Sequence, residues 1–171
     1  TTLFNLISGA LVPDAGEIRY KGKRITRSRP HQICRAGVAR TFQSVKVFAN
    51  MPVFENVLLG SLFGKSTGMS SADATREATG LLEFVGLSAV RATPAKDLTL
   101  ANQKRLEVAR ALATKPELLL LDELMAGLNP KEMEDTLKLI RKVHAEGMTI
   151  FVVEHVMKAI LSVSHRVIVL H

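Results

Sequence analysis

Two acids, Asp122 and Glu123, directly follow four consecutive leucines at 118–121. A short apolar run without alternation is typical of a strand covered on both faces, so these acids should lie at its carboxyl end. Ligands of open α/β sheets bind outside the carboxyl ends of the strands. There, one acid can hold a magnesium ion and the other can polarise a water molecule for attack. Two acids in this position can also simply end a strand and begin a turn, so the rest of the chain has to decide between these roles.

The elements around the acids predict a parallel sheet. Apolar runs at 117–121, 148–153 and 166–170 predict three strands. Between the first two, apolar residues recur at helical spacing from Asn129, a residue type suited to the N-cap, to Gly147, which ends the helix. A shorter helix is predicted before the third strand. Strands joined by helices in this way form a parallel sheet with right-handed crossovers.

The N-terminal part of the chain predicts a small antiparallel feature. The segment GEIRYKGKRIT at 16–26 predicts two short strands around Lys21 and Gly22. A helix is predicted for TTLFNLISG at 1–9, and a further short strand for VARTFQ at 38–43.

The middle of the chain is predicted to be helical. Helices are expected at 51–64 and 71–87, with a Gly/Ser/Thr-rich loop between them. The sequence therefore predicts one α/β domain, in which 1–50 and 97–171 form the core and 51–96 form an inserted helical subdomain.

Composition narrows the classes of function. At 171 residues the chain can form one domain with a substantial core, but hardly two. No apolar run approaches the ~18 residues of a membrane-spanning helix. Cys34 is the only cysteine, so no internal disulfide or thiolate metal cage can form, which fits the cytoplasm. No pair of histidines has a metal-ligand spacing with a supporting acid, so no zinc site is expected.

The net charge of +7 gives only weak support to a nucleic-acid surface. The basic residues are scattered apart from local clusters, chiefly the segment 21–31, which has no aromatic residues interleaved for base stacking. A solvated basic face is favoured, and no nucleic acid is expected as a partner.

Taken together and in order, several motifs resemble the ATP-binding subunit of an ABC transporter. LLLLDE at 118–123 resembles the Walker B motif with its catalytic glutamate, and AGLNP at 126–130 stands at the D-loop. VVEH at 152–155 ends on the switch histidine, and RTFQ at 40–43 supplies the Q-loop glutamine. The segment 98–123 matches the stretch from the signature helix to Walker B in length and chemistry. Each motif alone is weakly specific, but their order and spacing cover almost all of the chain.

The resemblance implies a P-loop NTPase fold with ATP and Mg²⁺ as cofactors. Asp122 would hold the metal, and Glu123 would polarise the attacking water. Gln43 would contact the metal or the water, and His155 would contact the γ-phosphate or assist the water. Without the other motifs, Gln43 and His155 are more simply polar residues at strand ends.

Thr1 and Thr2 resemble the end of a phosphate-binding loop of the pattern G-x-x-x-x-G-K-[ST]. In that loop a threonine hydroxyl ligates magnesium, so Thr1 is a further candidate metal ligand, and Thr2 a candidate contact to the nucleotide. By themselves, two threonines here would mean only a helix cap. The glycines and lysine of the pattern are not in the sequence. We therefore expect a fragment cut at both ends that is inactive by itself.

The resemblance places four nucleotide contacts in the signature segment, namely Thr99, Leu100, Ala101 and Asn102, where relatives read S-G-G-Q after a leucine. Threonine keeps the hydroxyl of serine, but the Cβ of Ala101 obstructs the close ligand approach that glycine permits. Asn129 replaces the usual aspartate of the D-loop and is a fifth candidate contact. These substitutions bear on the catalytic rate more than on the fold.

Within the family, RTFQSVKVFANMPVFENV and AGLNP are most similar to subunits that serve uptake of branched-chain amino acids and related amides. This resemblance implies an ATPase that is peripheral on the cytoplasmic face of the cell membrane. It would dimerise head to tail around two ATP molecules, as a homodimer or with a paralogue. The helical subdomain would drive membrane permease subunits, and a periplasmic binding protein would select the solute.

Two alternatives remain open at this point. The first is a soluble ATPase of the same superfamily that acts on nucleic acid or the ribosome, for which the positive charge is the only hint. The second is a degenerate cassette that binds nucleotide as a regulatory module without turnover. Glu123 and His155 favour activity, whereas Ala101 favours the degenerate form.

Overall fold

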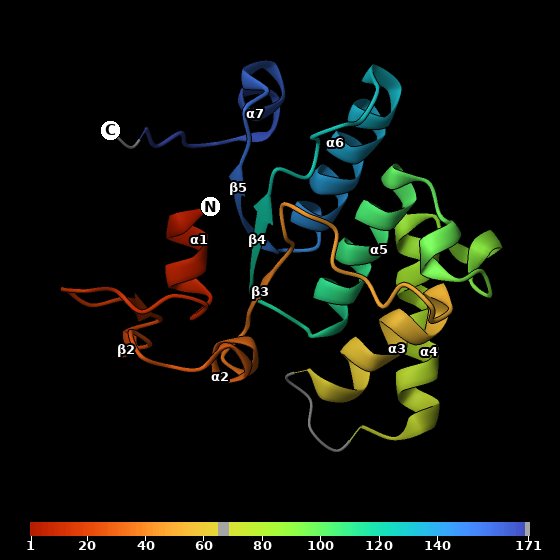
Figure 1. Ribbon diagram of the computed structural model, residues 1–171, viewed down its shortest axis with the longest axis horizontal. Helices are drawn as coiled ribbons and strands as arrows, with labels where there is room; N and C mark the ends of the chain where they lie inside the picture. The colour runs from red at the N-terminus through yellow and green to blue at the C-terminus, as the bar shows by residue number, and fades with distance from the viewer. Residues whose placement is uncertain (65–68, 170–171) are drawn as a thin grey trace.

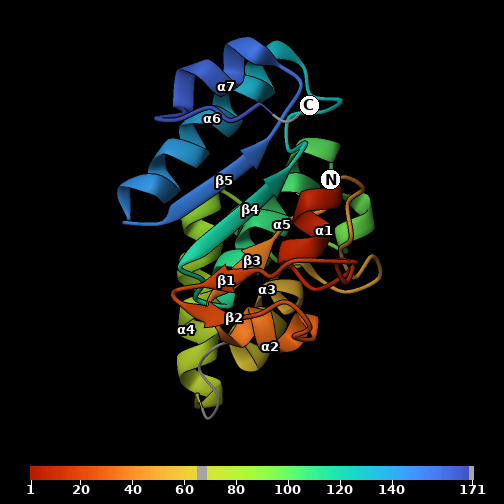
Figure 2. The ribbon, with the colours of Figure 1, turned by 90° about the vertical axis from the view of Figure 1, so that its left-hand side faces the viewer.

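A central sheet of three parallel strands organises the computed structural model, which describes residues 1–64 and 69–169. The strands lie in the order β3 (Val38–Arg40), β4 (Leu118–Asp122) and β5 (Thr149–Val153). Figure 2 looks onto this sheet, with β4 in the middle. Leu119, Leu120 and Leu121 are at most 1% exposed, as expected for a strand covered on both faces.

The predicted strand, helix, strand unit is confirmed, because α6 (Pro130–Ala145) connects β4 to β5. The helix begins with a reciprocal cap. Asn129 Oδ1 accepts the Glu132 N–H at 3.0 Å, and Glu132 Oε2 accepts the Asn129 N–H at 2.9 Å. The chain leaves α6 through Gly147, whose φ of +85° suits glycine. The cap predicted at Asn129 and the stop at Gly147 are thus both present.

One face of the sheet is covered by the N-terminal elements (Figure 1). These are α1 (Thr2–Ile7), the predicted antiparallel hairpin of β1 (Arg19–Tyr20) and β2 (Lys23–Arg24), and α2 (Pro30–Arg35), which the sequence analysis missed. Phe4 of α1 and Ile33 of α2 are buried together against Leu120 of β4. This small apolar cluster fixes α1 beside the sheet.

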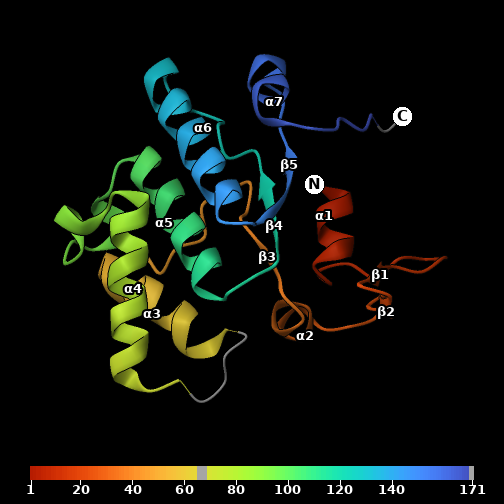
Figure 3. The same ribbon diagram turned by 180° about the vertical axis from the view of Figure 1, so that it is seen from behind.

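The other face is covered by helices. Beside α6 lies α5 (Leu100–Ala113), and α3 (Val53–Phe63) and α4 (Ser71–Val85) pack on the far side of α5 (Figure 3). The short 3₁₀ helices Ser88–Val90 and Ala95–Asp97 lead from α4 back to α5. One apolar cluster runs from α3 and α4 through α5 to β4 and α6. Of the loop expected between the two predicted helices, residues 65–68 lie outside the described residues. In the described ranges, no helix has both the length and the apolar character needed to cross a membrane.

The strand predicted at 166–170 is wrong for the part of it that the structure describes. The helix α7 (Met157–Val163) follows β5 as expected, but the chain then leaves the sheet without regular structure (Figure 1). Val167, Ile168 and Val169 are 46%, 60% and 86% exposed. A strand requires a neighbour for its backbone N–H and C=O groups, and no strand among the described residues pairs with this segment. The apolar run indicated burial, but could not supply that partner.

Candidate functional site

The carboxyl end of β4 lies beside the N-terminus of α1 and the chain that leaves β3 (Figure 1). Asp122, the last residue of β4, is fully buried. Its backbone N–H donates to Thr41 Oγ1 at 3.2 Å, and the Thr41 N–H donates to Leu120 O at 2.9 Å. The backbone at Asp122 is therefore bonded to the residue that directly follows β3.

Each oxygen of the Asp122 carboxylate has its own partner. Asp122 Oδ1 accepts a hydrogen bond from the Thr1 hydroxyl at 3.5 Å, and Asp122 Oδ2 accepts one from Arg40 Nη2 at 3.2 Å. The Arg40 side chain is only 8% exposed. Burial lowers the pKa of Arg40, whereas Asp122 raises it. The guanidinium still keeps its charge, because arginine does not lose its proton in proteins. The structure thus brings together two predicted site residues, Thr1 and Asp122, and adds Arg40.

Glu123 leaves the strand direction through a left-handed backbone with a φ of +48°, a conformation that a residue with a Cβ rarely adopts. Two bonds hold its backbone there. The Glu123 N–H donates to Val153 O at 2.9 Å, and Lys104 Nζ donates to Glu123 O at 3.0 Å. Strained backbone of this kind persists only where the surroundings determine it, and it is frequent at functional sites.

The Glu123 carboxylate is hydrogen-bonded to two other side chains that the sequence predicted at the site, those of Gln43 and His155. Gln43 Nε2 donates to Glu123 Oε2 at 2.9 Å, and His155 Nε2 lies 3.0 Å from Glu123 Oε1. The His155 side chain is 80% exposed and that of Glu123 is 14% exposed. The hydrogen bond with His155, followed by that from Gln43, lowers the pKa of Glu123. Glu123 is therefore an ionised acceptor at neutral pH, and both its oxygens are oriented by hydrogen bonds.

Two buried charged residues that the sequence analysis missed support the turn after β4. Lys104, from α5, donates to the Glu123 carbonyl, and Glu154 Oε1 accepts the Met125 N–H at 2.7 Å. Burial lowers the pKa of Lys104 and raises that of Glu154. Their position in the sequence could have identified them as site residues, since Glu154 directly precedes His155 and Lys104 follows the signature segment.

The signature segment caps α5 and, among the described residues, forms no hydrogen bond to the side chains of Asp122 or Glu123. Thr99 Oγ1 accepts the Asn102 N–H at 3.4 Å, as an N-cap does. Leu100 is 42% exposed and Ala101 is 9% exposed. A Cβ at Gly127, in the D-loop segment, would lie 3.0 Å from Leu100 Cδ2, so these two segments are in contact.

The remaining predicted residues lie outside the bonded cluster. In the part of the chain that the structure describes, neither the signature residues nor Asn129 or Thr2 hydrogen-bond to the side chains of Asp122 or Glu123. Thr2 is exposed at the first position of α1.

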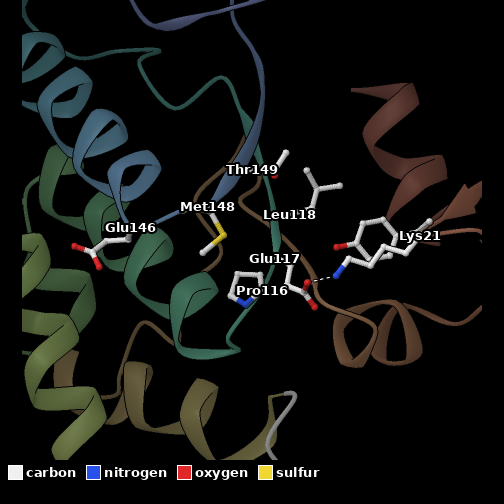
Figure 4. Close-up of a pocket in the computed structure, with 9 residues that line it drawn as sticks. Lys21, Pro116, Glu117, Leu118, Glu146, Met148 and Thr149 are labelled. Atoms are coloured by element: carbon white, nitrogen blue, oxygen red, sulfur yellow. Dashed lines mark hydrogen bonds and ion pairs between the residues drawn. The ribbon is translucent and has the colours of Figure 1, made fainter.

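A cavity of about 360 Å³ lies at the opposite end of the strands, beside the first residues of β4 and β5 (Figure 4). Its polar wall includes the exposed ion pair of Lys21 and Glu117. None of the predicted site residues lines it. The lining residues are Tyr20, Lys21, Pro116, Glu117, Leu118, Glu146, Gly147, Met148 and Thr149. This cavity is therefore separate from the end of the sheet where the candidate residues gather.

The donors around Asp122 suit magnesium better than a protein-caged metal. No cluster of three or more His, Cys, Asp or Glu side chains able to hold an ion occurs within 1–64 and 69–169. One carboxylate and one hydroxyl oxygen face each other at Asp122 and Thr1. Magnesium characteristically binds one or two carboxylates and takes its other ligands from water and substrate phosphates.

Comparison with known proteins places this arrangement in a family. The model of the family described as ABC transporter matches residues 1–126. The high-affinity branched-chain amino acid transport ATP-binding protein BraF of Pseudomonas aeruginosa is 37% identical over 184 residues, which cover 100% of this chain and 72% of BraF. The comparisons do not support the alternative of an ATPase acting on nucleic acid or the ribosome, or of a regulatory module.

Two solved structures share the fold. One is the ADP conformation of an ATP-binding cassette of an ABC transporter, with a TM-score of 0.80 at 30% identity, covering 94% of this chain and 67% of that one. The other is a dimeric post-hydrolysis state of an ATP-binding cassette bound to ADP and Pi, with a TM-score of 0.80 at 25% identity, covering 92% of this chain and 70% of that one. The predicted α/β P-loop class is confirmed, and this chain belongs to the ABC transporter family as one of its ATP-binding subunits.

Proposed function

We propose that this chain takes part in the ATP hydrolysis that powers an importer of branched-chain amino acids or related amides. The observation that carries the proposal is the convergence at one end of the sheet of five residues from four separate parts of the chain, namely Thr1, Gln43, the adjacent pair Asp122 and Glu123, and His155. The transport role named for BraF supports the class of solute.

Magnesium fits the oxygen donors of this site. The Thr1 hydroxyl and Asp122 Oδ1 would hold the ion, with Gln43 as a third candidate ligand. When bound, the ion neutralises phosphate charge and helps to orient the nucleotide. Asp122 contributes a carboxylate that is completely shielded from solvent, where an electrostatic interaction is stronger than in water.

Glu123 would act as the general base that accepts a proton from the attacking water. Its pKa is lowered by His155 and Gln43, so the carboxylate is ionised at neutral pH, as a base must be before it can accept a proton. His155 and Gln43 also fix the direction in which its oxygens point. The exposed His155 side chain would contact the γ-phosphate.

The signature segment would act on a nucleotide held by a second cassette. Thr99 caps the N-terminus of α5, a helix of 14 residues, where free N–H groups and the helix dipole favour a phosphate. Together with Leu100, Ala101 and Asn102 it lies apart from Asp122 and Glu123 of its own chain. A solved relative of the same fold is a dimer bound to ADP and Pi. We therefore propose a head-to-tail dimer, of identical chains or of paralogues, with Asn129 near its interface.

The helices of the middle segment would contact the transporter's other subunits. We propose that 51–96 acts as a helical subdomain on a core formed by 1–50 and 97–171, and that it transmits movement to membrane permease subunits. The ATPase would then be peripheral on the cytoplasmic face of the membrane. A periplasmic binding protein would interact with it only indirectly.

Steady-state ATP hydrolysis tests the proposed function. Protein expressed from the complete gene should turn over ATP only with Mg²⁺, and Glu123→Gln should lower kcat at least about 100-fold, because the general base is lost. Glu134→Gln, at an exposed position of α6, is the matched control and should keep wild-type turnover. Magnesium-independent turnover, or an active Glu123→Gln variant, would contradict the proposal.

A further inference from the structure

The Arg40 guanidinium joins three elements at the end of the sheet. From β3, its Nη2 donates to Asp122 Oδ2 on β4 at 3.2 Å. Its Nη1 donates to two residues of the α1 segment, Asn5 Oδ1 at 2.7 Å and Ser8 Oγ at 2.9 Å. Arg40 Nε donates to Thr41 O at 3.3 Å. Almost all of this side chain is withdrawn from solvent, so its position is determined by these partners.

These contacts control the orientation of the Asp122 carboxylate. A carboxylate is free to rotate about its last bond unless a partner fixes one of its oxygens. Arg40 fixes Oδ2, and Oδ1 is thereby left facing the Thr1 hydroxyl. The planar fork of a guanidinium is suited to this task, because the directions of its N–H groups are rigidly related.

Arg40 also determines where Thr1 lies relative to Asp122. Asn5 of α1 and Ser8, its C-cap, are three residues apart on the helix that Thr1 caps, and both accept from the same Nη1. A displacement of α1 along the sheet would break these bonds. The Arg40 Cζ lies 4.7 Å from the centre of the Phe42 ring, so the segment leading to Gln43 packs on the same side chain.

We propose that Arg40 is a positioning residue that aligns Asp122 Oδ1 with the Thr1 hydroxyl for magnesium. This inference rests on the proposed function, because it assumes that these two oxygens hold the ion. Arg40 acts through Asp122 and α1 and is not itself a ligand. Groups that orient metal ligands in this way typically change metal affinity or activity by about 10- to 100-fold when they are replaced.

The test measures metal affinity separately from turnover. Protein from the complete gene is saturated with a non-hydrolysable ATP analogue, and free Mn²⁺, used in place of Mg²⁺, is titrated by electron paramagnetic resonance. Arg40→Met should weaken Mn²⁺ binding about 10-fold or more, while binding of the analogue in EDTA stays at the wild-type level. Arg40→Lys should give an intermediate loss, because it restores the charge without the fork. Arg19→Met, which breaks an exposed ion pair with Glu17, is the matched control and should leave Mn²⁺ affinity unchanged.

Asn5→Ala keeps the ion pair but removes one of the two anchors on α1. It should weaken Mn²⁺ binding in the same direction as Arg40→Met and by less, and it decides the question if Arg40→Met does not fold. Wild-type Mn²⁺ affinity in a folded Arg40→Met variant, or in Asn5→Ala when Arg40→Met does not fold, would overturn the inference while the proposed function stands. Absence of nucleotide-dependent Mn²⁺ binding in the wild type would overturn both.

Discussion

Asp122 and Glu123 are adjacent in sequence but differ in backbone direction and in the exposure of the side chains that they bind. Asp122 continues the regular strand, is fully buried and is paired with a buried arginine. Glu123 has left the strand through a left-handed backbone, and its carboxylate meets the exposed His155. The partners of Asp122 come from β3 and α1, whereas those of Glu123 come from the chain after β3 and after β5.

This contrast shows how one strand end can serve two tasks. A metal ligand benefits from a fixed position, and burial with an arginine fixes Asp122. A general base has to exchange a proton with water, and Glu123, which is 14% exposed and meets the exposed imidazole of His155, is less completely enclosed than Asp122. The change of backbone direction between the two residues separates their carboxylates, although a single peptide bond joins them.

The largest effect is expected when the buried ion pair of Asp122 and Arg40 is broken. Asp122→Ala would leave the Arg40 guanidinium buried without its carboxylate, so the free energy of unfolding should fall by about 3 kcal/mol. Urea unfolding followed by circular dichroism measures this change. Asp14→Ala, at an exposed position, should have no measurable effect. A loss below about 1 kcal/mol in Asp122→Ala would show that the ion pair does not hold this end of the sheet.

A smaller effect, on the catalytic rate rather than on stability, is expected when the exposed His155 is replaced. His155→Ala removes a hydrogen bond that orients Glu123, so kcat should fall about 10-fold or more, while the thermal midpoint should not change, because the imidazole is largely in solvent. Kinetics and a thermal melt on the same preparation separate the two quantities. His31→Ala, on the exposed side of α2, is the control. If His155→Ala unfolds at a clearly lower temperature than wild type, the contact between His155 and Glu123 stabilises the fold, as the pair of Asp122 and Arg40 does.

Glu107 adds a third carboxylate that sharpens the comparison, since it is buried but lacks an ion pair among the described residues. Its Oε1 accepts the Lys46 N–H at 2.7 Å, and its Oε2 has no hydrogen-bond partner there. Burial raises the pKa of Glu107 above its ordinary value of 4.5. The folded protein therefore holds this proton more tightly than the unfolded chain, and stability decreases as pH rises from the unfolded to the folded pKa.

Glu107→Gln removes this titration and should flatten the dependence of unfolding free energy on pH above about 4.5. Urea unfolding at a series of pH values measures the slope. This is the smallest of the expected effects. An unchanged slope in Glu107→Gln would mean that burial does not shift this carboxylate.

The sequence predicted the parts of the fold that depend on local pattern. Asn129 begins α6 and Gly147 follows its end because capping chemistry and a positive φ are local properties. The leucines of β4 indicated its central position, because only a strand covered on both faces is apolar throughout. The candidate acids, Gln43 and His155 could be named because their motifs occur in a fixed order.

Long-range polar contacts could not be predicted in this way. Arg40 and Asp122 are 82 residues apart, and the strand around Arg40 gives no sign that its side chain points to β4 and α1. Lys104 stands in an amphipathic helix, where a lysine is ordinarily exposed. The strand expected at 166–170 failed for a related reason, since its apolar pattern does not say which strand would pair with it.

The separation of the two acids is tested most directly by titrating Mg²⁺ against nucleotide binding in Asp122→Asn and Glu123→Gln, with turnover measured on the same samples. We predict that Asp122→Asn loses the strengthening of nucleotide binding by Mg²⁺, whereas Glu123→Gln keeps it at the wild-type level and loses turnover. Loss of magnesium-dependent binding in both variants, or in neither, would contradict the assignment of metal binding to Asp122 and of proton transfer to Glu123.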